Sequence, residues 1–175
     1  MINGEKTTAK ETVYEGTILT LELHDVRTDL GNDAKREIIR HAAGVVIVGY
    51  TDDGRIPLVE QFRKPFEEAV LELPAGKLDE DEDPVTAARR EFQEETGYQA
   101  REMVFLGEAL TSPGYSDEVL HIYRATGLTH HPIPGDEDES FNYYELTREE
   151  VRALVLKGTL RDAKSLCAFY LDSLK

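Results

Sequence analysis

Hydrophobic and polar residues alternate, or gather into short apolar runs, over much of the first third of the chain and again after residue 102. Residues 18–23 alternate with the period of two that is typical of a half-buried strand. Residues 44–50 form a continuous apolar run of strand length, which favours a strand covered on both faces. The other strands predicted from these patterns span residues 55–62, 70–73, 103–110, 119–125 and 141–145.

The hydrophobic period changes at Asp83-Pro84, a pair that suits a helix N-cap and the first helical position. One apolar stripe with helical spacing follows, formed by Val85, Ala88, Phe92 and Thr96. Gly97 then supplies a stop signal. Two more helices are predicted at residues 148–157, capped by Thr147, and at residues 162–174. Strands, a central helix and closing helices together predict an α/β sandwich.

The composition is that of a folded domain with a strong acidic excess. The 175 residues are 40% apolar and 31% charged, with 20 Lys and Arg against 35 Asp and Glu, for a net charge of -15. This balance argues against nucleic acid as a partner, because a polyphosphate backbone needs a basic face. It leaves room for a small anionic substrate, since a divalent cation held by carboxylates reverses the local charge.

Targeting and redox signals are few. Cys167 is the single cysteine, so no internal disulfide can form; we expect a structural, buried side chain in a reducing compartment. Residues 1–10 are polar and lack the apolar stretch of a signal peptide. No apolar run approaches the roughly 20 residues that a membrane helix needs. The expectation is a cytoplasmic protein with no membrane partner.

The predicted helix after Asp83 carries three carboxylates in one sector, from Glu91, Glu94 and Glu95. Like charges at this spacing destabilise a helix by a few tenths of a kcal/mol per pair, so some cation should offset them. A solvated helix face is the alternative for the bare pattern. The preceding residues 73–76 are expected to end a strand in a tight turn whose carbonyls face the same cation. Mg²⁺ binds such oxygen ligands together with substrate phosphate oxygens.

The segment 76–98 resembles the Nudix box over its full length. It reads GKLDEDEDPVTAARREFQEETGY, and its fixed positions are Gly76, Glu82, Arg90, Glu91, Glu94, Glu95 and Gly97. Phe92 and Tyr98 satisfy the two hydrophobic positions, although Phe92 is less usual there than leucine. The resemblance implies a Nudix-type α/β/α sandwich with a mixed sheet, in residues 43–175. Residues 1–42 would form an N-terminal β-rich segment before it.

Residue roles follow from that resemblance. The carbonyl of Ala75 and the side chains of Glu91 and Glu95 are expected to bind Mg²⁺, with Mn²⁺ as a substitute and Glu94 as a further ligand. Glu82 and Arg90 are expected to brace the loop and the helix, together with Gly76 and Gly97 as structural glycines. The family hydrolyses nucleoside diphosphates linked to another group, by attack of a metal-activated water on phosphorus. Glu91 and Glu95 are therefore assigned to catalysis.

Residues 111–118, TSPGYSDE, narrow the substrate. On their own they indicate a turn between strands. Pro113 stands sixteen residues beyond Gly97, and this spacing resembles the ADP-ribose pyrophosphatase branch of the family. By that resemblance Pro113, Gly114 and Glu118 bind substrate, and so does Arg63, whose guanidinium would orient the diphosphate. A solvent-exposed Arg at a strand end is the alternative for Arg63.

The acidic loop 135–139 precedes the last predicted strand, and most such runs are simply solvated. In ADP-ribose hydrolases a mobile loop at this place delivers a glutamate that acts as general base. Glu139 matches it best by its distance from the following strand, and Glu137 is the rival. A base on a closing loop can exclude water until the complex forms.

These observations predict Mg²⁺-dependent hydrolysis of ADP-ribose to AMP and ribose 5-phosphate. The alternatives are a sugar-nucleotide pyrophosphatase of the GDP-mannose or ADP-glucose type, and a sensor that binds ADP-ribose without cleaving it. The resemblance also implies a homodimer in which the N-terminal β segment contributes to the adenine side. Arg36 and Arg40 are expected on an exposed strand face, and a role in orienting the anion, like that of Arg63, is the alternative.

Overall fold

The computed structural model describes residues 4–135 and 140–175. Contacts divide the chain into two units. The first unit comprises Met1–Ala43 and Leu110–Val119. The second unit comprises Gly44–Ala109 and Leu120–Lys175.

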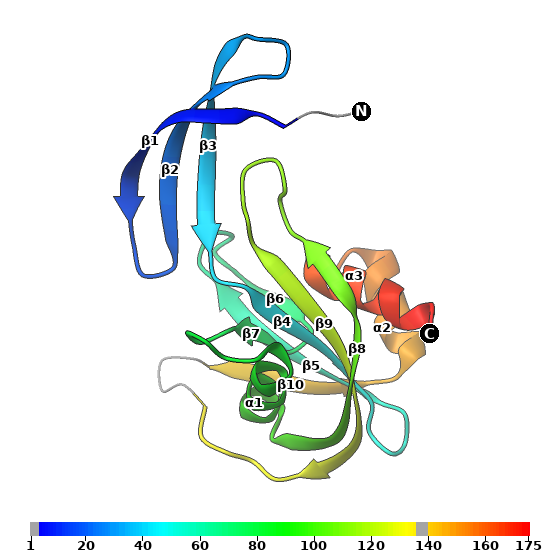
Figure 1. Cartoon of the computed structure of the whole chain (residues 1–175). Helices are drawn as coiled ribbons and strands as arrows, with labels where there is room; N and C mark the ends of the chain where they lie inside the picture. Colours follow the sequence, from blue (N-terminus) through cyan, green and yellow to red (C-terminus); the bar gives the residue numbers. More distant parts are fainter. Residues whose placement is uncertain (1–3, 136–139) are drawn as a thin grey trace. The chain divides into compact units, whose positions relative to one another are not determined.

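Strands dominate the order of elements (Figure 1). The elements are β1 (Lys6–Glu15), β2 (Leu19–Arg27), β3 (Asp33–His41), β4 (Gly44–Gly49), β5 (Ile56–Arg63), β6 (Glu68–Glu72), β7 (Ala75–Lys77), α1 (Pro84–Thr96), β8 (Tyr98–Leu110), β9 (Val119–His130), β10 (Phe141–Leu146), α2 (Arg148–Lys157) and α3 (Ala163–Ser173). Within the described residues, no helix is long and apolar enough to cross a membrane.

The first unit is an antiparallel sheet in the order β1-β2-β3. Every residue of β1 is exposed, which explains why this strand shows little of the apolar pattern expected of a buried strand. The segment 110–119 attaches to β3 through main-chain hydrogen bonds. Ile39 N donates to Tyr115 O over 2.7 Å, and Asp117 N donates to Ile39 O over 3.2 Å. This segment contains the turn predicted from Ser-Pro-Gly-Tyr.

The second unit holds a mixed sheet in the order β7-β4-β9-β8, in which β4 is parallel to β9 and antiparallel to β7. Every residue of β4 is buried, so the strand is covered on both faces as predicted. Val45 and Ile47 pack in the cluster that contains the apolar face of α1. Val46 and Val48 pack in the cluster that contains residues of α3. Helices therefore cover both faces, which confirms the predicted α/β/α sandwich.

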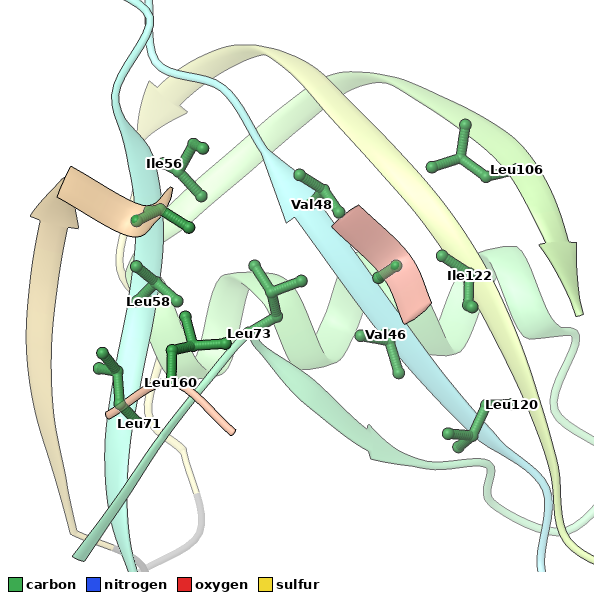
Figure 2. Packing of buried hydrophobic residues seen from close by; sticks show 12 residues of the cluster. Val46, Val48, Ile56, Leu58, Leu71, Leu73, Leu106, Leu120, Ile122 and Leu160 are labelled. Atoms are coloured by element: carbon green, nitrogen blue, oxygen red, sulfur yellow. The ribbon is translucent and has the colours of Figure 1, made fainter. Parts of the chain in front are cut away.

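A second, antiparallel sheet in the order β10-β5-β6 completes this unit. Its inward side chains Ile56, Leu58 and Leu71 join the cluster around β4 (Figure 2). Leu73 and Leu160, both fully buried, fill the space between the two sheets and the C-terminal helices. Burial of this cluster fixes the end of β6, and with it the start of the glycine-containing segment 75–77.

Several boundaries differ from those predicted. Residues 75–77 form the short strand β7 paired with β4, where a tight turn was expected, because three residues are too few for a periodic pattern. Strand β8 begins at Tyr98, directly after the helix, and not at residue 103. Cys167 is free and only partly buried, at the edge of the cluster around β4.

Candidate active site on the acidic face of α1

Helix α1 is fixed at both ends and along one face. The Asp83 side chain accepts a hydrogen bond from Thr86 N, Pro84 occupies the first turn, and Gly97 ends the helix with a φ of 73° in the left-handed region. Ala88 and Phe92 are fully buried against the sheet. The N-cap, the C-cap and the apolar stripe predicted from the sequence are thus confirmed, and the acidic sector of the helix points away from the stripe.

Two of the three carboxylates lie against strand β7. Glu95 Oε2 accepts a hydrogen bond from Ala75 N over 3.1 Å. The Glu91 carboxylate lies directly over the Cα of Gly76, because a Cβ added there would lie 1.9 Å from its carboxyl carbon and 2.2 Å from each oxygen. Only glycine leaves room for this close approach. The side chains and the Ala75 main chain are therefore brought together by the packing of α1 on β7.

Arg90 connects the carboxylates of the helix to the loop before it. Its Nε and Nη2 donate to Glu82 over 3.1 and 2.8 Å. Its Nη1 donates to Glu91 over 2.8 Å and to Glu94 over 3.2 Å. Nη2 also donates to the carbonyl of Lys77 over 3.2 Å. One guanidinium therefore connects the loop, strand β7 and the helix face.

The charges of this cluster stabilise one another. Hydrogen bonding to Arg90 lowers the pKa of Glu82 below its ordinary value, although partial burial opposes the shift. Hydrogen bonding to Glu82, together with the nearby charge of Glu91, raises the pKa of Arg90 above the ordinary value of an arginine. Glu82 and Arg90 are therefore charged at neutral pH, and the loop is held by a charge-assisted, bidentate pair.

The donor set suits a hard divalent cation. Carboxylates of Glu91 and Glu95 lie beside the main chain of Ala75 and Gly76, and Glu94 is joined to Glu91 through Arg90. Oxygen ligands of this kind are the ones that Mg²⁺ prefers. Among residues 4–135 and 140–175, no three Asp, Glu, His or Cys side chains form a ready-made cage. A cation here would depend on a main-chain oxygen and on substrate phosphate oxygens as well.

Arg63 ends strand β5 in the same unit. Its Nε and Nη2 donate to the two carboxylate oxygens of Glu72, each over 2.7 Å. The charge of Glu95 contributes to raising the pKa of Arg63, after the larger effect of the hydrogen bonds to Glu72. The guanidinium therefore lies within electrostatic range of the acidic face of α1, and it is held in one plane by Glu72.

The other predicted substrate residues belong to the first unit. Pro113 and Gly114 lie exposed in the turn, while Glu118 is half-buried with Oε1 3.5 Å from His41 Nδ1. Glu139 and its rival Glu137 lie outside the described residues. Arg36 lies on the expected strand and pairs with Glu5. Arg40 lies there too, and it pairs with Glu22 and Asp117.

Sequence reasoning missed Glu72 and Lys164. Glu72 sits in the run VLELPAG, where a lone glutamate between leucines would normally alternate to the solvent side of the strand. It is instead 3% exposed and pairs with Arg63 and with Lys164 from α3. The signal in the sequence was the charged residue inside an apolar run, because a buried carboxylate requires cationic partners.

A family model described as the NUDIX domain matches residues 40–169. The chain belongs to the Nudix family. The match covers α1, the acid cluster and both sheets of the second unit, so the resemblance seen in the segment 76–98 is confirmed as membership.

Curated relatives match this Nudix chain over most of its length. It is 40% identical to the methanol dehydrogenase activator of Bacillus methanolicus, over 94% of this chain and 90% of the relative. It is 40% identical to the ADP-ribose pyrophosphatase of Bacillus subtilis (strain 168), over 98% of this chain and 94% of the relative. It is 34% identical to a GDP-mannose pyrophosphatase of Yersinia pestis (strain Pestoides F), over 81% of this chain and 77% of the relative.

A solved structure described as an ADP compounds hydrolase has the same fold. Its TM-score is 0.90 at 24% identity, and the match covers 99% of this chain and 94% of the other. With the family match and the pyrophosphatase relatives, the chain is a Nudix hydrolase of the class that acts on nucleoside diphosphate compounds.

Proposed function

We propose that this Nudix hydrolase splits the diphosphate of ADP-ribose to give AMP and ribose 5-phosphate, in a reaction that depends on Mg²⁺. The observation that carries the reaction class is the acidic face of α1, with Glu91 packed on Gly76 and Glu95 bonded to the Ala75 amide. The substrate is supported by the 40% identity to the ADP-ribose pyrophosphatase of Bacillus subtilis over 98% of the chain.

In this proposal the carbonyl of Ala75 and the carboxylates of Glu91, Glu94 and Glu95 hold Mg²⁺, which Mn²⁺ can replace. When bound, Mg²⁺ supplies neutralisation of the diphosphate and activation of the attacking water. Glu94 must share its carboxylate with Arg90, whose hydrogen bond to it is 3.2 Å long. Glu91 shares its carboxylate with Arg90 as well, over 2.8 Å. Glu91 and Glu95 are the principal ligands in this proposal and Glu94 is a further one, as the resemblance to the Nudix box implies.

The remaining chemistry falls to other groups of the chain. Glu139 takes a proton from the attacking water, with Glu137 as the alternative base. Arg63 orients the diphosphate through its planar array of N–H donors. Glu118, Pro113 and Gly114 contact the rest of the substrate. Holding the reacting groups in place in this way lowers the barrier mainly through orientation and charge stabilisation.

The proposal extends to assembly and location. We infer a homodimer in which residues 1–42 contribute to the adenine side of the partner's site, and residues 43–175 carry the catalytic centre. We also infer a cytoplasmic enzyme, from the single cysteine. Sedimentation equilibrium tests the assembly: a single species of twice the 19.7 kDa chain mass supports it, and a monomer contradicts it.

The runner-up function is a sugar-nucleotide pyrophosphatase that shares the metal ligands and differs in the base and sugar contacts. It is favoured by the 34% identity to the GDP-mannose pyrophosphatase of Yersinia pestis, which is lower and covers less of the chain than the match to ADP-ribose pyrophosphatase. A sensor that binds ADP-ribose without cleavage is less well supported. A protein without catalysis has no need of three neighbouring carboxylates that repel one another on one helix.

Product analysis with a panel of nucleotide sugars, with and without Mg²⁺, tests the proposal. Mg²⁺-dependent release of AMP, fastest from ADP-ribose, is the expected result. Faster cleavage of a GDP- or ADP-hexose would support the same reaction but contradict ADP-ribose as the preferred substrate. Binding of ADP-ribose without cleavage of any compound supports the sensor. Glu95→Gln prepared in parallel is the control, because a contaminating phosphatase would persist in it.

The relative named methanol dehydrogenase activator is as similar to this chain as the ADP-ribose pyrophosphatase is. The same preparation is therefore added to a methanol dehydrogenase. A rise in dehydrogenase turnover with wild type and none with Glu95→Gln would show that activation uses the same carboxylates. An equal rise with both would separate activation from hydrolysis.

A further inference from the structure

Glu72 is a buried carboxylate on which two cations from distant parts of the chain meet. Its side chain is 4% exposed, at the end of β6 and three residues before Ala75. Arg63 at the end of β5 donates two hydrogen bonds of 2.7 Å to it, one to each carboxylate oxygen. Lys164, in the first turn of α3, bonds the oxygen that also receives Arg63 Nη2. The three groups form a chain from α3 through β6 to β5.

Electrostatic interactions keep Glu72, Arg63 and Lys164 charged. Burial alone would raise the pKa of Glu72, but the hydrogen bonds and charges of Arg63 and Lys164 outweigh it and lower the pKa below its ordinary value. The carboxylate is thus ionised at neutral pH and holds both cations. Lys164 lies 3.1 Å from Asp162 as well, so its position is fixed from two sides.

The geometry leaves Arg63 one orientation and spare hydrogen-bonding capacity. A guanidinium has five N–H donors in a rigid plane, and Glu72 accepts two of them. Arg63, Glu72 and Lys164 border a cavity of about 510 Å³, whose rim includes the ion pair of Arg161 with Glu68. Three of the five N–H donors of Arg63 are therefore not used by Glu72.

The main chain that follows Glu72 leads directly to Ala75, beside the carboxylates of α1. Ser165, the residue after Lys164, is fully buried, and its Oγ accepts a hydrogen bond from Leu73 N over 2.8 Å. Helix α3 therefore fixes both the Glu72 side chain and the main chain just before Ala75. The same short segment thus sets the place of Arg63 and the start of strand β7.

We propose that Glu72 and Lys164 are positioning residues, which hold the Arg63 guanidinium in the orientation that receives the substrate's diphosphate. The inference rests on the proposed function and adds two residues to it. An arginine without this anchor would have to be ordered by each substrate molecule, and immobilising one long side chain costs about three- to tenfold in affinity. Glu72 and Lys164 act through Arg63 and so affect binding more than turnover.

Steady-state hydrolysis of ADP-ribose with Mg²⁺ tests the inference. Lys164→Met removes the charge and keeps most of the side-chain volume, and Glu72→Gln keeps the shape. We expect KM to rise about three- to tenfold in each, with kcat within about twofold of wild type. Lys164→Arg should restore KM, because it returns a cation to Glu72. Arg101→Met breaks an exposed ion pair with Glu102 outside this cavity and is the matched control, with KM unchanged.

A purely structural role predicts a different pattern. Lost stability would lower the active fraction, and with it the apparent kcat, while KM stayed the same; urea unfolding of each variant measures that fraction independently. In an Arg63→Ala background, Lys164→Met should add no further increase in KM. Unchanged KM in both Lys164→Met and Glu72→Gln overturns this inference alone. Absence of hydrolysis by the wild type overturns the proposed function and this inference with it.

Discussion

Gly76→Ala should remove most of the activity of this enzyme without destabilising it. The Cβ of alanine would lie 1.9 Å from the carboxyl carbon of Glu91, whereas ordinary contact begins near 3.4 Å. The carboxyl carbon must therefore move about 1.5 Å directly away from strand β7. The clashing atoms are the far end of a flexible side chain, so the main chain does not need to move.

The two consequences differ in size. A misplacement of about 1 Å costs about 100-fold in rate, or about 2.7 kcal/mol of transition-state stabilisation. Gly76 lies in a strand, and its φ is not among those in the left-handed region, so alanine is compatible with the backbone. Replacing such a glycine commonly stabilises by about 0.4–1 kcal/mol through the unfolded chain. We therefore expect a free energy of unfolding within about 1 kcal/mol of wild type.

The assay measures kcat with ADP-ribose and Mg²⁺, and urea unfolding of the same preparations. Combining Gly76→Ala with Glu91→Ala completes a double-mutant cycle. If the glycine acts through the Glu91 carboxylate, Gly76→Ala adds almost nothing once that carboxylate is gone. The reasoning is refuted if the loss is equally large in both backgrounds, or if Gly76→Ala alone keeps full activity.

Four further predictions concern other parts of the chain. Glu95→Gln should cut turnover by orders of magnitude with the fold intact by circular dichroism; near-normal turnover would remove the metal-site assignment. Glu139→Gln should lower kcat with little change in Mn²⁺ affinity, and the base is Glu137 if only Glu137→Gln does so. Phe92→Ala should destabilise by about 3–5 kcal/mol in urea unfolding, because the ring is fully buried; a loss under 1 kcal/mol would contradict that packing. Hydrogen bonding, mainly from Lys10, lowers the pKa of Glu22 from 4.5 to about 2, so its stabilisation is present above pH 4.5 and lost toward pH 2. The stability gap between wild type and Glu22→Gln should therefore narrow over that range, and a constant gap would contradict the shift.

Local sequence patterns predicted the elements that local forces decide. The caps of α1 at Asp83 and Gly97 were predictable because each acts on main-chain groups within one turn. The double burial of β4 followed from its unbroken apolar run. Strand β7 was not predictable, since it is three residues long and exists through pairing with β4, which lies about thirty positions earlier. Its existence matters to function, because it carries Ala75 and Gly76.

The site shows the same division. The spacing of the carboxylates on α1 is a property of one helix, and the sequence alone placed them together. The pair of Lys164 with Glu72 joins residues 92 positions apart, and no periodic pattern reports such a contact. The pair of Arg40 with Asp117 joins residues 77 positions apart and ties the Pro-Gly turn to strand β3. The ionic partner of a charged residue cannot be read from that residue's own type.

Arg90 changes the reasoning about why the acidic helix survives its own repulsion. The sequence suggested a divalent cation as the group that offsets three clustered carboxylates. In the structure the Arg90 guanidinium bonds Glu82, Glu91 and Glu94, so the protein supplies part of the compensating charge itself. A cation that binds Glu91 and Glu94 must then compete with Arg90, which weakens the metal site when no substrate is present. Substrate phosphate oxygens would add ligands and tilt that competition toward the metal. Metal affinity should therefore rise when a nucleoside diphosphate is bound. Because of this coupling, the cation is held strongly only in the substrate-bound enzyme.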